Sequence, residues 1–117
     1  CSGKVYYHLL EARDEKKIKN IAIIRIEQLY PFPDIEMDNI LKKYSYVESI
    51  IWCQEEPRNQ GAWYNSQHFL RAAVGRLSED LSLDYCGRAS SAAPASGYMS
   101  VHLEEQRRFI NEALETK

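Results

Sequence analysis

Two adjacent carboxylates, Glu55 and Glu56, open the polar stretch EEPRNQGAW and raise the question of acid–base chemistry. Carboxyl groups that lie close together can share a proton, which separates their pKa values and suits one to act as acid and the other as base. On an extended chain, however, neighbouring side chains point to opposite faces. The spacing therefore predicts that the two groups do not converge on one substrate atom.

The remainder of this stretch is typical of the corner where a strand becomes a helix. Pro57 stiffens the exit from a strand, Asn59 or Gln60 can bond free backbone amides, and Gly61 permits a sharp turn. A tryptophan two residues further on fits a core or a subunit contact. We interpret the stretch as a corner that also forms an interface, with the candidate residues Glu55, Glu56, Asn59, Gln60 and Trp63.

A second loop, GRASSAAPASG at residues 87–97, places an arginine before a run of small residues. Small side chains let backbone amides approach a phosphate, and a guanidinium can bind one bidentately. The loop is neither a Walker loop nor GxGxxG, and close packing against another domain or subunit needs the same small residues. Both interpretations stay open, with packing favoured. The candidates for binding an effector are Arg88, Ser90 and Ser91.

Other arrangements of reactive side chains are not evident from the spacing. No Ser-His-Asp, Cys-His or metal-binding pattern can be assembled, and His102 is expected to form a hydrogen bond near the last helix. The cysteines, at positions 1, 53 and 86, are odd in number and widely spaced, which does not indicate a disulfide framework and fits a reducing compartment. We expect Cys53 and Cys86 to be buried thiols.

The bulk composition is that of one ordinary globular domain. The chain has 117 residues, of which 44% are hydrophobic and 27% charged, with a net charge of -2. This charge gives no general attraction to nucleic acid or to an anionic membrane. The apolar runs are far shorter than a bilayer span.

Strand-like segments alternate with helical ones, which favours an α/β fold. The β-branched run at residues 21–26 is typical of a strand covered on both faces, and further strands are predicted at 47–53 and 81–86. Such a pattern predicts a three-layer sandwich with a mainly parallel sheet and ligand or partner sites beyond the carboxyl ends of its strands. Helices are expected at residues 4–17, after Asp34, at 62–77 and at 101–114, the last with Leu103, Ile110 and Leu114 facing inward.

The opening residues CSGK have the character of a turn that follows a strand. The strand that should lead into Cys1 is missing, so we expect the chain to be a piece of a longer polypeptide.

Four segments, in order and covering nearly the whole chain, resemble the carboxyl-terminal domain of the 2-oxoglutarate dehydrogenase family. The motifs IEQLYPFP and CQEEPRNQGAW are long enough to be specific, and GAWYNSQH and YMSVH are more similar to bacterial than to mitochondrial forms. The segments are SGKVYYHLLEAR at 2–13, AIIRIEQLYPFP at 22–33, WCQEEPRNQGAW at 52–63 and YCGRASSAAPASGYMSVHLEEQ at 85–106.

The resemblance implies that residues 1–117 are a single transketolase-like carboxyl-terminal domain, without its first strand and the thiamine-binding domains that precede it. The parent enzyme would be a homodimer that uses thiamine diphosphate and magnesium. Such an enzyme decarboxylates 2-oxoglutarate and passes succinyl to a lipoyl group on the dihydrolipoyl succinyltransferase component, in the bacterial cytoplasm or the mitochondrial matrix. The sequence contains no GDG motif, so the resemblance assigns it no catalytic or cofactor-binding residue. It implies an assembly domain; the alternative is a regulatory module that binds a nucleotide or acyl-CoA effector.

Overall fold

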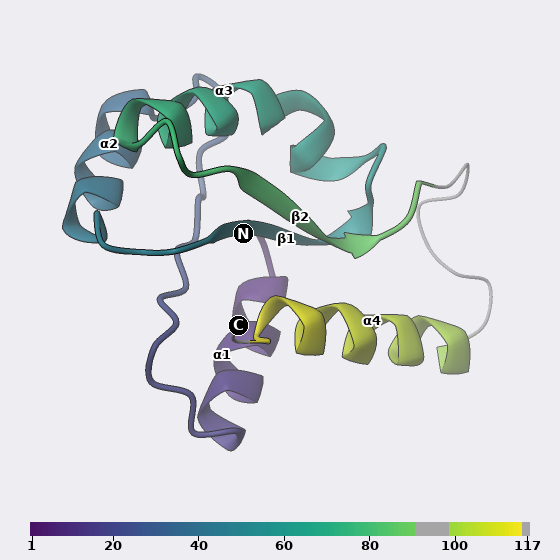
Figure 1. The fold of residues 1–117 in the computed structure, drawn as a ribbon. Coiled ribbons are helices and arrows are strands. Elements are labelled where there is room, and N and C mark those ends of the chain that lie inside the picture. Colours follow the sequence, from purple (N-terminus) through teal and green to yellow (C-terminus); the bar gives the residue numbers. More distant parts are fainter. Residues whose placement is uncertain (91–98, 116–117) are drawn as a thin grey trace.

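A computed structural model describes residues 1–90 and 99–115 of the chain. Two helices come first, and from β1 onward strands and helices alternate as the sequence predicts (Figure 1). In chain order they are α1 (Val5–Glu15), α2 (Asp34–Lys43), β1 (Ile50–Pro57), α3 (Gly61–Leu77), β2 (Leu83–Arg88) and α4 (Met99–Ala113).

The two strands form a parallel sheet whose register brings their carboxyl ends together. Ile50 pairs with Leu83 at one end, and Cys53 pairs with Cys86 in the middle. An irregularity follows Cys53, after which pairing resumes between Pro57 and Arg88. Because β1 and β2 are parallel, the connections to α3 and α4 leave from the same edge of the sheet.

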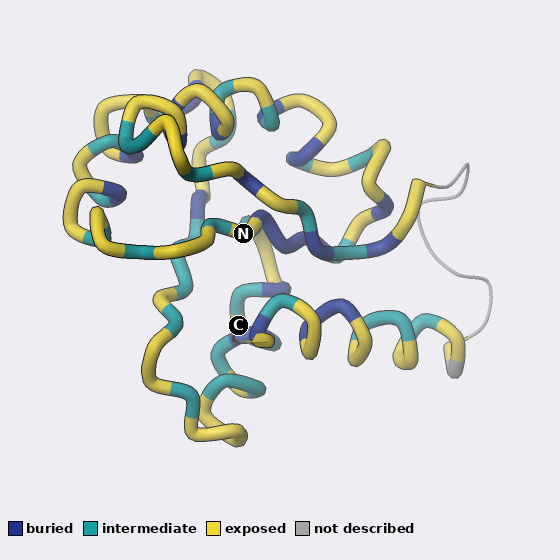
Figure 2. The backbone as a smooth tube through the Cα atoms, in the orientation of Figure 1, coloured by how far each residue is buried: buried dark blue, intermediate teal, exposed yellow. Residues whose placement is uncertain are grey.

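Helices cover both faces of the sheet, which confirms the predicted three-layer arrangement. Helices α2 and α3 lie on one side of the strands, and α1 and α4 lie on the other (Figure 1). Each side has its own buried cluster, seen as dark blue segments along the strands and inner helix faces in Figure 2. Trp52, Trp63 and Leu70 belong to the cluster under α3, and Val5, Cys53 and Phe109 belong to the cluster under α1 and α4.

The prediction of a strand at residues 21–26 is wrong: the segment is extended but belongs to no sheet of the described residues. Its side chains alternate between the layers as predicted, with Ile23 against one cluster and Ile26 inside the other. Its backbone bonds to Cys1, whose N–H donates to the Ile24 carbonyl at 3.1 Å and whose carbonyl accepts from the Ile26 N–H at 2.9 Å. In the described part of the chain no strand flanks the segment, so no ladder forms.

Three smaller expectations also need correction. β1 continues through Glu55 and Glu56, which the sequence assigns to a loop, because the strand resumes pairing at Pro57. β2 ends at Arg88, two residues beyond its predicted end. Leu103 does not face inward but is 51% exposed, because α4 packs on the sheet mainly through its second half.

Candidate functional site

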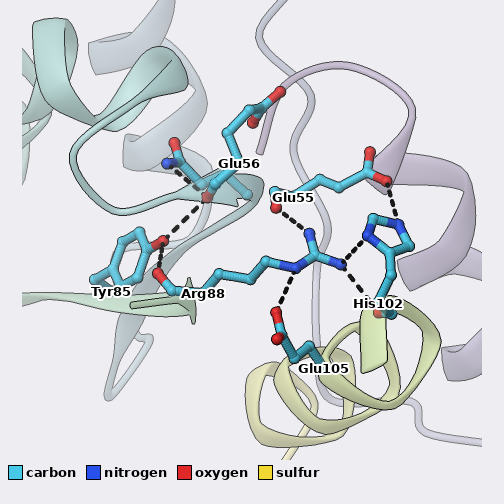
Figure 3. Close-up of polar contacts among 7 residues, drawn as sticks. Glu55, Glu56, Tyr85, Arg88, His102 and Glu105 are labelled. Carbon is cyan, nitrogen blue, oxygen red and sulfur yellow. Dashed lines mark hydrogen bonds and ion pairs between the residues drawn. The ribbon is translucent and has the colours of Figure 1, made fainter. Parts of the chain in front are cut away.

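The carboxyl edge of the sheet gathers the residues that the sequence singles out. β1 delivers Glu55 and Glu56, β2 delivers Arg88, and α4 brings His102 and Glu105 across to meet them (Figure 3). Ligands and partners of open α/β sheets usually bind beyond this edge. The chemistry of the edge therefore depends on whether these groups face outward or bond to one another.

Arg88 faces inward and joins three elements. Only 5% of the residue is exposed, and its Nε donates to Glu105 Oε2 at 2.9 Å. One terminal nitrogen donates to the His102 carbonyl at 3.1 Å and lies 3.2 Å from the Nδ1 of the same residue. The other donates to the Glu55 carbonyl, and the guanidinium lies 5.1 Å from the centre of the Phe109 ring. Arg88 thus holds the first half of α4 against the end of β1.

This arrangement bears on the predicted effector site. A phosphate could reach the Arg88 guanidinium only by displacing its contacts with Glu105, His102 and the Glu55 carbonyl. Ser90 is exposed at the end of the described segment, and Ser91 lies outside the described residues. The effector site stays a prediction from the sequence, and the geometry of Arg88 does not favour it.

The carboxylates of Glu55 and Glu56 point apart, as an extended backbone predicts (Figure 3). The Glu55 Oε1 atom lies 3.8 Å from His102 Nε2. Glu56 turns the other way, toward Gly61, where no side chain fits, because a Cβ there would lie 2.9 Å from Glu56 Oε2. Gly61 also has a φ of +65°, so its place at the start of α3 requires glycine on two grounds. The pair of carboxylates cannot serve one reacting atom.

Gln54, which the sequence reasoning missed, organises the corner after β1. It is 1% exposed, and its Oε1 accepts bonds from Trp52 Nε1 at 3.0 Å and from the Trp63 backbone N–H at 2.9 Å. Its Nε2 donates to the carbonyls of Pro57 at 3.0 Å and Gln60 at 2.9 Å. The available signal was alternation: Gln54 follows Trp52 by two residues, so it shares a buried face, where a polar group must be bonded.

Trp63 is a core residue of this domain. It is 2% exposed and packs between the Tyr85 ring, 5.3 Å away between centroids, and the Arg71 guanidinium, 5.2 Å from its ring centre. Burial raises the pKa of Tyr85 to about 12, and its hydroxyl donates to the Arg88 carbonyl at 2.9 Å. Trp63 is therefore too buried to touch a partner directly and could affect an interface only by supporting the loop at residues 58–60.

The exposed part of the corner is small and polar. Glu56, Arg58 and Asn59 are exposed, and Gln60 is half-buried. Asn59 and Gln60 both have interactions within the chain. Among the residues described, no group of three or more His, Cys, Asp and Glu side chains could hold a metal ion, and no helix has the length and apolar character that crossing a bilayer demands. The polar groups of the described edge thus bond largely within the chain, and its exposed part is the short segment of Glu56, Arg58 and Asn59.

Comparison with known proteins identifies the family to which the chain belongs. A family model described as 2-oxoglutarate dehydrogenase C-terminal matches residues 1–114. The 2-oxoglutarate dehydrogenase E1 component of Azotobacter vinelandii is 50% identical over 97% of the chain, and that of Haemophilus influenzae is 52% identical over the same share. The mitochondrial 2-oxoglutarate dehydrogenase of Schizosaccharomyces pombe is 46% identical, also over 97% of the chain.

The chain spans 12% of the length of the two bacterial relatives and 11% of the fungal one. The matched family is thus defined by one domain of a much longer protein. With a whole-length match to its model and about half of its residues identical to those relatives, the chain belongs to the 2-oxoglutarate dehydrogenase C-terminal family.

Proposed function

We propose that the chain is the carboxyl-terminal assembly domain of a 2-oxoglutarate dehydrogenase E1 component and supplies contacts, not reacting groups. The longer enzyme would be an oxidoreductase that decarboxylates 2-oxoglutarate with thiamine diphosphate and magnesium and transfers succinyl to lipoyl groups of the dihydrolipoyl succinyltransferase component. Its relatives include bacterial and mitochondrial proteins. The similarity to bacterial motifs favours the bacterial cytoplasm as its location.

The observation that carries this proposal is the inward orientation of the polar groups at the carboxyl edge. Arg88 bonds to β1 and α4, Gln54 bonds to the corner that follows it, and Glu55 lies beside His102. Groups held this way stabilise the fold and are not presented to a substrate. A buried, bonded arginine is also costly to disturb, since leaving its partners unpaired costs about 3–5 kcal/mol.

The described residues do not fit thiamine diphosphate or its magnesium ion. Binding the diphosphate–magnesium unit requires convergent oxygen ligands and donors that face the phosphates. Here Glu55 and Glu56 diverge, and the Arg88 guanidinium is directed at its own chain. We therefore assign cofactor binding and the chemical steps to the other domains of the longer enzyme.

The exposed tip of the corner is the proposed contact surface. Glu56, Arg58 and Asn59 project from the sheet edge, and the Arg58 guanidinium lies 5.0 Å from the Tyr85 ring centre. A mixture of charges, amides and a supporting aromatic ring is suited to the rim of a protein interface. Gln60 and Trp63 lie behind this tip and fix its shape, so the second subunit or a neighbouring domain would meet a rigid surface.

The test uses the full-length E1 component. The double variant Arg58→Ala with Asn59→Ala is compared with Lys43→Ala, at the far end of α2. We expect the tip variant to raise the dimer dissociation constant about tenfold, equivalent to roughly 1.4 kcal/mol, with turnover per dimer unchanged. Sedimentation and 2-oxoglutarate turnover report the two quantities. A dimer of normal affinity that has lost turnover would contradict the assembly role.

We also propose that residues preceding Cys1 in the longer enzyme continue as a strand beside residues 21–26. The support is the pattern in which Cys1 donates to Ile24 and accepts from Ile26, because one residue bonds in this way to two residues of a parallel neighbour. Extending the chain at its amino end should slow amide hydrogen exchange across residues 21–26. Unchanged exchange there would count against the strand.

A further inference from the structure

Two buried thiols lie side by side at the centre of the sheet. Cys53 and Cys86 are paired residues of β1 and β2, so their side chains project to the same face. Both belong to the cluster under α1 and α4, and they are 3% and 7% exposed. Adjacent strands are about 4.8 Å apart, which falls within the Cα separation of roughly 4.4–6.8 Å that a disulfide requires.

We propose that Cys53 and Cys86 form a reversible disulfide when the protein meets a small peroxide, making the pair a modification site. The bond would join the two strands beneath α4. Disulfides open by thiol–disulfide exchange, in which a thiolate attacks one of the two sulfurs. A thiol reductant should therefore reopen the bond.

The surroundings give the two sulfurs different roles. The Cys86 Sγ donates to the Phe109 carbonyl at 2.9 Å and lies 3.8 Å from Glu112 Oε2. A hydrogen bond from Cys53 lowers the pKa of Cys86, against burial and the Glu112 carboxylate, which raise it. The hydrogen bond with Cys86, together with burial, raises the pKa of Cys53. Cys86 is the more exposed of the two thiols, and its pKa is lowered whereas that of Cys53 is raised. We therefore assign the first reaction with peroxide to Cys86 and the role of resolving thiol to Cys53.

The chemistry balances with one peroxide per pair. The Cys86 thiolate attacks one peroxide oxygen, the O–O bond breaks, and the departing hydroxide takes a proton to become water. The Cys53 sulfur then attacks the sulfenic sulfur of Cys86, the S–OH bond breaks, and the second hydroxide leaves as water with the Cys53 proton. The two sulfurs are oxidised, the two peroxide oxygens are reduced, and one S–S bond is formed.

A third thiol must be kept out of the reaction. Cys1 is only partly buried, and it packs against the same cluster. Treatment of the folded chain with a maleimide should block Cys1 and spare the two buried thiols, and the variant Cys1→Ser provides the same control without a reagent. Trypsin then separates the three cysteines, because cleavage after lysine and arginine leaves them on peptides 1–4, 44–58 and 77–88.

The experiment treats the folded, Cys1-blocked chain with hydrogen peroxide, alkylates under denaturing conditions and maps the peptides without reduction. Met99 is 73% exposed, so its conversion to sulfoxide serves as a dose marker. At a dose that oxidises Met99, we expect peptides 44–58 and 77–88 to be linked in most molecules and to separate after dithiothreitol. Recovery of both as free, alkylated thiols at that dose would overturn the proposal.

Variants test the order of the two steps. In Cys53→Ala the resolving thiol is gone, so dimedone should trap sulfenic acid on Cys86, and no linked peptide should form. In Cys86→Ala neither product should appear on Cys53 at the same dose. Labelling of Cys53 in preference to Cys86 would overturn the assigned roles, and the wild-type peptide map does not depend on how well either variant folds.

Discussion

When residues 1–117 are prepared as a separate chain, the amino group of Cys1 should make the stability of that chain depend on pH. Its nitrogen donates to the Ile24 carbonyl at 3.1 Å in a partly buried site beside the cluster under α1 and α4. Burial lowers the pKa of this amine from 8.0 to about 6, against a smaller opposing effect of Cys53. In the unfolded chain the amine is hydrated and keeps its ordinary pKa, so the folded and unfolded states bind different numbers of protons over part of the pH range.

The sign and size of the effect follow from the two pKa values. Below pH 6 the amine of Cys1 is charged in both states, and the folded protein carries the full cost of burying that charge. Between about pH 6 and pH 8 the unfolded state binds more protons, so the free energy of unfolding rises with pH. At about 1.36 kcal/mol for each pKa unit, the total rise is about 2.7 kcal/mol.

Urea unfolding measured from about pH 5.5 to about pH 8.5 tests this dependence. The matched control is the same chain acetylated at its amino terminus, which keeps the N–H that donates to Ile24 but removes the charge. Subtracting the acetylated profile removes contributions from the histidines. At low pH the free chain should have a lower free energy of unfolding than the acetylated chain. We expect this difference to shrink by roughly 2–3 kcal/mol as the pH rises. Parallel profiles for the free and acetylated chains would refute the reasoning.

Three substitutions probe the packing of the sheet edge, each by urea unfolding. Gln54→Met should cost about 3 kcal/mol, because it leaves buried donors and acceptors unpaired; a loss under about 1 kcal/mol would show that water replaces the amide. Gly87→Ala should cost about 1–3 kcal/mol, since its Cβ would lie 2.6 Å from a tyrosine hydroxyl. The control is Gly75→Ala, where a Cβ would meet open space within a helix, and it should instead stabilise the fold by about 0.5–1 kcal/mol. If both glycine substitutions cost the same stability, the clash at Gly87 would not explain its loss. Arg88→Met should cost about 3–5 kcal/mol. The control Arg76→Met removes an exposed ion pair and should cost far less, so a similar loss for both would contradict the inward role of Arg88.

Periodicity predicted the elements whose partners lie within the chain. The helix predicted at residues 62–77 corresponds to α3, which begins one residue earlier and ends at the same residue, and the predicted strand at 47–53 overlaps β1. In each case the apolar stripe packs against a neighbour that the described chain itself supplies. Residues 21–26 show the limit of the method: an apolar, β-branched run predicts extended backbone, but a strand also needs a neighbour to bond with.

The corner residues are harder to predict because their roles depend on contacts across the fold. The motif indicates Asn59 and Gln60 as the groups that bond the corner, yet the amide that the structure places at its centre is Gln54, one residue after the predicted strand. Arg88 is a candidate for binding phosphate when only its neighbours in the loop sequence are considered. Its actual partners on α4 are 14 and 17 residues away, too far for a local pattern to reveal.

The edge of a parallel sheet leaves backbone carbonyls without ladder partners, and here Gln54 and Arg88 bind them. The Gln54 side chain donates hydrogen bonds to the carbonyls of Pro57 and Gln60, and the Arg88 guanidinium donates one to the carbonyl of Glu55. The Arg88 carbonyl in turn accepts from the Arg58 backbone N–H at 3.1 Å. A surface fixed in this way has little conformational entropy left to lose on association, which is a large cost of forming interfaces. The same bonds that turn these groups inward therefore give the edge the rigidity that the proposed assembly role requires.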